Sequence, residues 1–444
     1  MTDEKQSGEA ITKYSDLDVL NYHSSNYPGN GKIETISKTS VTNARDLTLA
    51  YSPGVAVACL AIEKDPKSLY HYTNVGNTVA VISNGTRILG LGDIGMAGYP
   101  VMEGKSILFK ALANVDAMPF ILDTKDPDEL IRTAEIMAQN FGGINLEDIR
   151  KPDCFYIERK LDEKLPIPVF HDDQWGTAIV TLSAAINSVK VLGKKFEDLK
   201  VVVHGAGASG IAISTMLLGR GVKGSNMQVI DRVGSIYDGR HEDMNPYKQE
   251  LAEKVNPKKK FLKLEDAVEG ADLLIGVSSK GMFKEKHIKK MATDPMIFAL
   301  ANPVPEILPP EAIEAGAKII GTGRSDFNNQ INNILGFPAI FRGALDVKAT
   351  KVTMNMKIAA AEAIAGVLTE DELSVDKVIT EPTDPRLMPA EAASVAQAAV
   401  KDGVAQRKLS YDEVYQFTKE RIEYYKQTAG KIVETRSKKQ LYNF

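Results

Sequence analysis

Cysteine and tryptophan are scarce in this chain of 444 residues, which contains two cysteines and one tryptophan. The cysteines, Cys59 and Cys154, lie far apart in the sequence and form no C-x-x-C pair. A disulfide framework and a thiolate zinc site both need more cysteines at closer spacing, so the sequence argues against both. Few cysteines also fit a reducing compartment, and we therefore expect a cytoplasmic protein.

An excess of charge of one sign is also missing. The chain has 54 basic and 58 acidic side chains, a net charge of −4. This balance gives no general attraction to nucleic acid or to an anionic membrane, so we expect a small-molecule partner. The polar N-terminal segment lacks the apolar stretch of a secretory signal, and the hydrophobic pattern predicts no transmembrane span.

The length of the chain is sufficient for two domains, each with a core of its own, and 43% of the residues are apolar. In the second half, short apolar runs alternate with helical patterns, which is typical of a doubly wound parallel sheet. We predict an α/β protein with a first domain at 1–172, a Rossmann-like domain at 173–345 and helices at 346–444 that fold back on the domains. The predicted Rossmann strands are 200–204, 227–231, 272–277, 296–301 and 318–321.

The first domain shows a hairpin signal at the dipeptide Asn84-Gly85, which lies between the apolar runs 78–83 and 87–91. We predict that these two runs pair as an antiparallel hairpin. Further along, the pattern predicts helices at 103–115, 127–140 and 175–192, with a short strand at 118–122.

A glycine-rich turn follows the first predicted Rossmann strand and precedes an apolar helical run. It consists of Gly205, Ala206, Gly207, Ala208, Ser209 and Gly210. The first glycine permits a tight turn, the second lets the backbone approach a pyrophosphate, and the third allows the helix to pack closely on the strand. Asp231 ends the next strand, where a carboxylate accepts hydrogen bonds from a ribose. The turn predicts an NAD or NADP site, and the adjacent Arg232 leaves the choice between them open.

Two pairs of acids follow short apolar runs of the first domain. Glu147 and Asp148 form one pair, and Asp172 and Asp173 the other. Adjacent acids are more often a solvated turn or a helix cap. The second pair, however, precedes the predicted buried helix, and buried acids need partners such as a hard divalent cation. The sequence therefore predicts a Mg²⁺ or Mn²⁺ site.

Five further polar residues are candidates for the site. Tyr51 lies in a Tyr-Ser-Pro-Gly turn and Lys105 begins an otherwise apolar helix, where a lysine near acids is suited to act as a base. Arg87 follows an apolar strand and is suited to bind a carboxylate. Asn302 and Asn333 follow late strands, and their amides are suited to hold substrate or nicotinamide.

Seven segments together resemble the compact malic enzymes, in the same order and over roughly residues 40–400. The segments are LAYSPGVA, GTRILGLGDIGMAGYPVMEGKSILFK, NLEDI, FHDDQWGTA, HGAGASG, ALANPVPE and GTGRSDFNNQINNILGFPAIFRGALD. The resemblance implies oxidative decarboxylation of (S)-malate to pyruvate and CO₂, with NAD(P)⁺ and Mg²⁺ or Mn²⁺. It also implies a homodimer, and leaves open whether Tyr51 acts in its own subunit or in the neighbouring one.

The resemblance further implies roles for individual residues. Tyr51 matches the general acid, Lys105 the general base and Asp172 the acid that supports the base. Glu147, Asp148 and Asp173 match the metal ligands. These assignments are expectations from the family.

Other classes of protein fit parts of the pattern. A metal-dependent oxaloacetate decarboxylase with weak redox activity would use the same acids, but would leave the glycine-rich turn idle. A nucleotide-sensing module without catalysis predicts the loss of Tyr51, Lys105 or Asp173, and none is lost. An amino-acid dehydrogenase with a similar plan would need no metal, so the effect of a chelator separates it from a malic enzyme.

Overall fold

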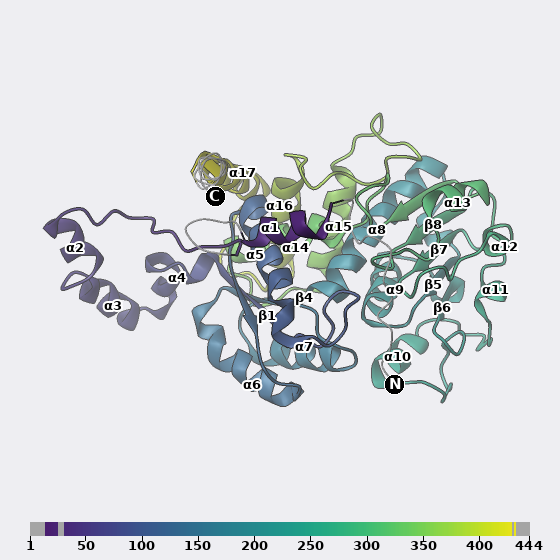
Figure 1. Cartoon of the computed structure of the whole chain (residues 1–444), viewed down its shortest axis with the longest axis horizontal. Helices are drawn as coiled ribbons and strands as arrows, with labels where there is room; N and C mark the ends of the chain where they lie inside the picture. The colour runs from purple at the N-terminus through teal and green to yellow at the C-terminus, as the bar shows by residue number, and fades with distance from the viewer. Residues whose placement is uncertain (1–13, 25–30, 429, 432–444) are drawn as a thin grey trace.

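The computed structural model describes residues 14–24, 31–428 and 430–431. It contains two parallel sheets with helices around them, arranged side by side (Figure 1). The first sheet has the strand order β2-β1-β3-β4, and every pairing in it is parallel. All six residues of β1 are buried, which explains its continuous run of small and β-branched residues. The strands are β1 (Thr78–Ser83), β2 (Asp116–Ile121), β3 (Gly143–Leu146) and β4 (Val169–His171), and the connecting helices are α5 (Tyr99–Ala113), α6 (Pro127–Met137) and α7 (Asp153–Lys164).

The predicted hairpin around Asn84-Gly85 is wrong. Residues 87–91 form no strand, and only an isolated bridge joins Ile88 to Gly92. Gly85 does turn the chain, with a φ of +67°, but the chain then folds into a loop that returns to Gly85 through the backbone N–H groups of Ile94 and Gly95. Both neighbours of β1 are therefore parallel strands supplied by crossover connections, and a local turn signal carries no information about them.

The second sheet has the order β6-β5-β7-β8-β9, again with every pairing parallel. The five predicted strands are confirmed, each within two residues at either end. The chain direction across the sheet changes between β5 and β7, and ligands of doubly wound sheets bind at such a point. The strands are β5 (Val201–His204), β6 (Met227–Ile230), β7 (Leu273–Gly276), β8 (Met296–Ala299) and β9 (Ile319–Thr322). The helices are α9 (Ala208–Arg220), α10 (Pro246–Ala252), α11 (Leu264–Ala267), α12 (Glu285–Ile288) and α13 (Pro309–Glu314).

A long buried helix, α8 (Asp172–Leu192), joins the two sheet layers, as the sequence predicts. The later helices fold back, which is also confirmed: α15 packs on α8 and α9, while α14 and α17 pack on α5. The Asn187 amide of α8 donates to the carbonyls of Ala365 and Val378 at 3.0 Å each, and so fixes the C-terminal segment to the central helix. The helices are α14 (Phe337–Asp346), α15 (Met354–Gly366), α16 (Leu387–Lys401) and α17 (Tyr411–Gln427).

The helices α2, α3 and α4 form an arm that extends from the body at the left of Figure 1, whereas α1 lies over the body. No residue of α2 or α3 is buried, and Leu47, Val57 and Leu60 are all more than half exposed. Two stretches, 44–64 and α8, are long and apolar enough to cross a membrane by length and composition alone. The first is divided by the turn between α2 and α3, and the second lies mostly inside the protein. The helices are α1 (Asp16–Ser24), α2 (Ala44–Ala50), α3 (Val55–Lys64) and α4 (Leu69–Tyr72).

Candidate active site

The two acidic pairs meet at one edge of the first sheet. Glu147 and Asp148 directly follow β3, Asp172 and Asp173 directly follow β4, and these strands pair in parallel. One carboxylate oxygen from each of Glu147, Asp148 and Asp173 lies within 4.8 Å of the others. The Asp148 backbone N–H donates to Asp173 Oδ2 at 2.8 Å, which holds the two pairs together. The structure thus gathers the three predicted metal ligands.

The electrostatics of these three acids suit a divalent cation. Burial and repulsion by the neighbouring carboxylates raise the pKa of Glu147 well above its usual value and that of Asp148 to about 7. Asp148 Oδ2 is buried without a hydrogen-bond partner among the described residues. Carboxylate oxygens at this spacing are the ligands that Mg²⁺ and Mn²⁺ prefer. The donor set therefore fits the predicted metal.

Lys105 lies beside this acidic cluster. The helix α5 begins at Tyr99, so Lys105 lies in its second turn. The sequence pattern had instead indicated that Lys105 begins the helix. Its ammonium forms an ion pair with Asp172, lies 3.3 Å from Glu147 Oε1 and lies 4.3 Å from the centre of the Phe337 ring. Burial lowers the pKa of Lys105, but attraction by Asp172 and Glu147 outweighs it and the pKa lies above its usual value. The lysine is therefore charged when the acids have no other cation.

Asp172 is held in place from two further sides. The Asn333 amide, at the start of a short turn before α14, donates to the same carboxylate oxygen as Lys105. Gly176 leaves room for the carboxylate, since a Cβ there would lie 1.9 Å from Asp172 Oδ1. The sequence did not show the contact between Asn333 and Asp172, because 160 residues of chain separate them and no local pattern reports such a pairing.

Arg87 and Asn302 lie on loops of opposite sheets that approach each other. The Arg87 backbone N–H donates to the Asp148 carbonyl at 3.1 Å, and its exposed guanidinium helps to lower the pKa of Asp148. Asn302 follows β8, and a Cβ at Gly90 would lie 3.5 Å from the neighbouring Pro303. Arg87 is therefore next to Asp148, whereas the Asn302 amide lies beside Gly323 of the second sheet, where a Cβ would lie 3.2 Å from its Oδ1.

Tyr51 is the predicted site residue that the structure does not bring to the others within one chain. It caps α2 on the N-terminal arm, and its side chain is 69% exposed. Figure 1 shows this arm pointing away from the sheet that carries the acids. Within the described part of the chain, no hydrogen bond joins Tyr51 to Lys105 or to the acids.

The glycine-rich turn connects β5 to α9 at the point where the second sheet changes direction. Gly205 has a φ of +121°, and a Cβ at Gly210 would lie 1.7 Å from the Gly205 carbonyl oxygen. The hydroxyl of Ser209 donates to the Asp173 carbonyl at 2.8 Å. The start of α9 and the acidic cluster are thus in direct contact, and a dinucleotide on the turn would adjoin the metal ligands.

Gly210→Ala should disrupt the turn, because the added methyl group collides with backbone rather than with a flexible side chain. We expect a loss of about 1–3 kcal/mol in the free energy of unfolding, typical of overpacking, and at least tenfold weaker dinucleotide binding by calorimetry. Gly219→Ala on the same helix is the matched control, since its Cβ would lie 3.4 Å from Ile358 Cδ1. Equal dinucleotide affinity in the two variants would contradict this role of Gly210.

Asp231 follows β6, as predicted, but its carboxylate already has protein partners. Arg240 forms an ion pair with it, and Lys248 Nζ lies 2.7 Å from Asp231 Oδ2. Arg232 is mostly exposed and pairs with Asp243. The sequence analysis missed Arg240, and also Lys151, whose Nζ lies 3.4 Å from a Cβ built on Gly207. Lys151 stands only three residues after Asp148, which is the one signal that could have indicated it.

A dinucleotide-binding sheet joined to a second sheet with a lysine and clustered acids defines a two-domain oxidoreductase. Comparison with known proteins then gives the family. Residues 30–127 match the malic enzyme N-terminal domain, and residues 175–401 match the malic enzyme NAD-binding domain. The chain belongs to the malic enzyme family.

Individual relatives agree with this assignment. A bifunctional malic/malolactic enzyme of Bacillus subtilis (strain 168) is 52% identical, over 88% of this chain and 95% of its own length. An NAD-dependent malic enzyme of Geobacillus stearothermophilus is 49% identical, over 90% and 83%. An NADP-dependent malic enzyme of Haemophilus influenzae is 48% identical, but the chain spans only 54% of it. The solved malic enzyme of Pyrococcus horikoshii Ot3 has a TM-score of 0.92 at 46% identity, covering 96% of this chain and 99% of that one.

Proposed function

We propose that the acidic cluster, Lys105 and the glycine-rich turn form one active site that oxidises and decarboxylates (S)-malate to pyruvate and CO₂ with NAD⁺ or NADP⁺. The observation that carries this proposal is the contact between Ser209 of the turn and Asp173 of the cluster. This contact supports a hydride-accepting dinucleotide next to the acids that would chelate the metal. Family membership supports the same reaction, because the relatives above are malic enzymes.

Lys105 is suited to take the proton of the C2 hydroxyl while hydride leaves C2 for the nicotinamide. Asp172 orients the Lys105 ammonium, and Asn333 in turn orients Asp172, so both residues keep the base in position. Glu147, Asp148 and Asp173 would hold Mg²⁺ or Mn²⁺, which when bound supplies a Lewis acid for the developing charge on oxygen. A cation there also offsets the negative charge that raises the pKa of Lys105, and so favours the neutral lysine that a base requires.

The second half of the reaction breaks the bond between C3 and the departing carboxylate. CO₂ leaves, the electron pair of that bond forms the enolate of pyruvate, and C3 must then accept a proton. Arg87 lies at the junction of the sheets and is suited to bind a substrate carboxylate. Tyr51 is the acid that the family pattern assigns to the protonation of C3.

The position of Tyr51 supports a homodimer in which it completes the neighbouring subunit's site. The arm that carries it is apolar and exposed, and an exposed apolar surface of this kind marks a protein contact. A two-fold dimer would bring each arm to its partner, since such interfaces are reciprocal. This arrangement reconciles the exposed Tyr51 with a role beside Lys105.

Subunit mixing tests this arrangement. Tyr51→Phe and Lys105→Ala should each be nearly inactive alone. After dissociation and random reassociation, half of the dimers carry both mutations and have one intact site of two, so about one quarter of wild-type activity should return. If Tyr51 acts within its own subunit, each site in a mixed dimer holds one mutation and no activity returns.

The charged residues around Asp231 support use of both cofactors. Arg240 and Lys248 neutralise Asp231, which removes much of its repulsion toward a ribose 2′-phosphate, and the exposed Arg232 lies beside it.

We also propose that the chain divides into a first domain at 1–172, a Rossmann-like domain at 173–345 and C-terminal helices at 346–444. The sheet that leads to the acids then belongs to the first domain, and the glycine-rich turn belongs to the second. We further propose a cytoplasmic location.

The decisive experiment combines the protein, (S)-malate and Mn²⁺ with NAD⁺ or NADP⁺ and follows absorbance of the reduced cofactor. We expect turnover that EDTA abolishes and Mn²⁺ restores. Absence of reduction with either cofactor would refute the dehydrogenase function. Decarboxylation of oxaloacetate without any reduction of cofactor would favour a lyase instead, and turnover that resists EDTA would favour a metal-free dehydrogenase.

A further inference from the structure

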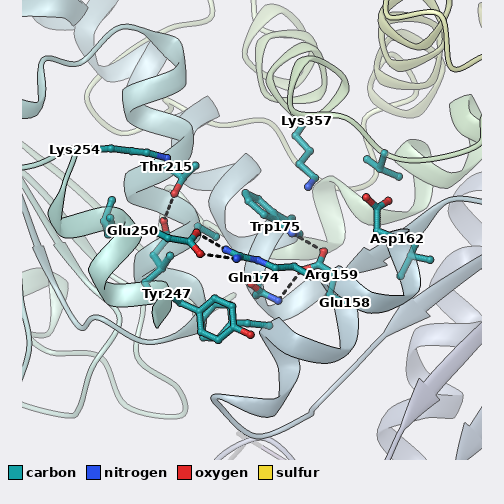
Figure 2. A pocket seen from close by; sticks show the side chains of 16 residues that line it. Glu158, Arg159, Asp162, Gln174, Trp175, Thr215, Tyr247, Glu250, Lys254 and Lys357 are labelled. Carbon is teal, nitrogen blue, oxygen red and sulfur yellow. Dashed lines mark hydrogen bonds and ion pairs between the residues drawn. The ribbon is translucent and has the colours of Figure 1, made fainter. Parts of the chain in front are cut away.

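A cavity of about 250 Å³ lies where the two sheet layers and the C-terminal helices meet, away from the proposed active site (Figure 2). Its walls come from α7, α8, α9, α10 and α15, so no single domain encloses it. None of the candidate malate, metal or dinucleotide residues lines it. Junctions of this kind are preferred places for small-molecule sites.

Lys357 of α15 points into this cavity (Figure 2). The residue is only 8% exposed, and its Nζ lies 3.5 Å from the centre of the Trp175 ring. No carboxylate or carbonyl among the described residues accepts a hydrogen bond from it. An ammonium has three N–H donors, so a group in the cavity can supply acceptors that the protein does not. Burial lowers the pKa of Lys357 to about 8, although Glu158 and Asp162 act in the opposite direction.

Two charged neighbours of Lys357 in this cavity, Glu158 and Arg159, already have protein partners. Glu158 accepts from the Trp175 indole N–H at 2.6 Å and from the Gln174 amide at 2.8 Å. Arg159 forms two hydrogen bonds of 2.7 Å with Glu250, and Figure 2 shows this pair crossing the cavity below Lys357. An anion that entered the cavity would therefore meet the Lys357 ammonium without displacing an existing pair.

The surroundings of Lys357 select the type of anion. Glu158 and Asp162 are close enough to influence its charge, and they would repel a second negative charge on a ligand. The Trp175 ring, Ile211 and Val352 supply apolar wall for a short carbon chain. We propose that the cavity binds a small monocarboxylate, whose carboxylate accepts from Lys357 and whose carbon chain packs on Trp175.

The position of the cavity makes its occupant an effector of the active site. Trp175 is two residues after Asp173 at the start of α8, and Ile211 directly follows the glycine-rich turn at the start of α9. A ligand between these helices contacts both elements that present the metal acids and the dinucleotide turn. Binding is therefore coupled to the affinity for Mn²⁺ or for the dinucleotide. This coupling rests on the proposed function, whereas binding itself does not.

Trp175 makes the binding directly measurable, because it is the single tryptophan of the chain. Butyrate is the probe, since it lacks the 2-hydroxy or 2-oxo group that chelates a metal. Titration of the whole protein with butyrate, in EDTA, should give a saturable change of tryptophan emission, with half-saturation on the order of 1 mM. Lys357→Met should weaken this binding at least about tenfold, because a charge-assisted hydrogen bond is lost.

Three comparisons decide the proposal. Lys190→Met, at an exposed lysine on α8, should bind butyrate like wild type. An emission change that is absent in wild type, or unaltered by Lys357→Met, would overturn the site. Inorganic phosphate that binds as tightly as butyrate would overturn the preference for a monocarboxylate.

The kinetic arm uses butyrate during malate oxidation. We expect the KM for Mn²⁺ or for the dinucleotide to change at least about threefold in wild type and to stay constant in Lys357→Met. Binding without such a change would overturn the effector role. An inactive protein that still shows the emission change would count against the proposed function and leave the binding site supported.

Discussion

Lys105→Ala should lower kcat/KM for malate oxidation by roughly 10²–10⁴-fold, the usual contribution of a general base. The loss follows because Lys105 is the proposed base, and its ammonium lies 3.3 Å from Glu147 Oε1 of the acidic cluster. Dinucleotide binding, measured by calorimetry, should stay within about twofold of wild type, because the glycine-rich turn contacts Asp173 and not Lys105. Steady-state rates with malate and Mn²⁺ provide the main measurement.

The control for this variant must separate catalysis from folding. Removing one partner of a buried ion pair costs about 3–5 kcal/mol, and Asp172 would remain buried without its cation. Lys105→Arg keeps the charge but has too high a pKa to accept a proton, so it should fold better than Lys105→Ala and still be inactive. Lys110→Ala, whose partner Asp116 lies outside the acidic cluster, should retain activity. Turnover like wild type in Lys105→Arg would remove Lys105 from the role of base.

The second sheet was predictable because strands that are buried on both faces consist of short continuous apolar runs. The strands β7 and β8 are examples, since every residue in them is buried. The hairpin at Asn84-Gly85 failed for the opposite reason: a turn signal describes four residues, whereas the partners of β1 come from strands formed by 116–121 and 143–146. Sequence order therefore predicts parallel layers better than it predicts the local loop that holds Arg87.

Within the candidate site, adjacent residues were easier to find than distant ones. The acids follow apolar strands, so their meeting at one sheet edge follows from the predicted topology. The support of Asp172 by Asn333, and of Asp231 by Arg240, depends on loops whose path no pattern specifies. Lys357 shows the same limit, because a lysine among alanines on a helix is usually a solvated side chain and only the packing of α15 on α8 buries it.

Asp173→Asn should raise the Mn²⁺ concentration for half-maximal activity by more than about 100-fold. Loss of an outer partner of a metal ligand usually costs 10–100-fold, and loss of the charged ligand itself costs more. The backbone contact should survive, because the asparagine carbonyl can still accept from the Asp148 N–H that now donates to Asp173 at 2.8 Å. Activity assayed over a range of Mn²⁺ concentrations measures the effect.

Thermal melting separates metal binding from a general structural defect. In EDTA the variant should be at least as stable as wild type, because it relieves the repulsion that helps to raise the pKa of Asp148 to about 7. With Mn²⁺ at about 100 times the wild-type Kd, wild type should gain about 2.7 kcal/mol and the variant almost nothing. Asp198→Asn, at an exposed acid paired with Lys223, should respond to Mn²⁺ like wild type. If Mn²⁺ stabilises Asp173→Asn as much as wild type, Asp173 is not a ligand of the metal. The contact between the acidic cluster and the glycine-rich turn would then not bring the metal to the dinucleotide.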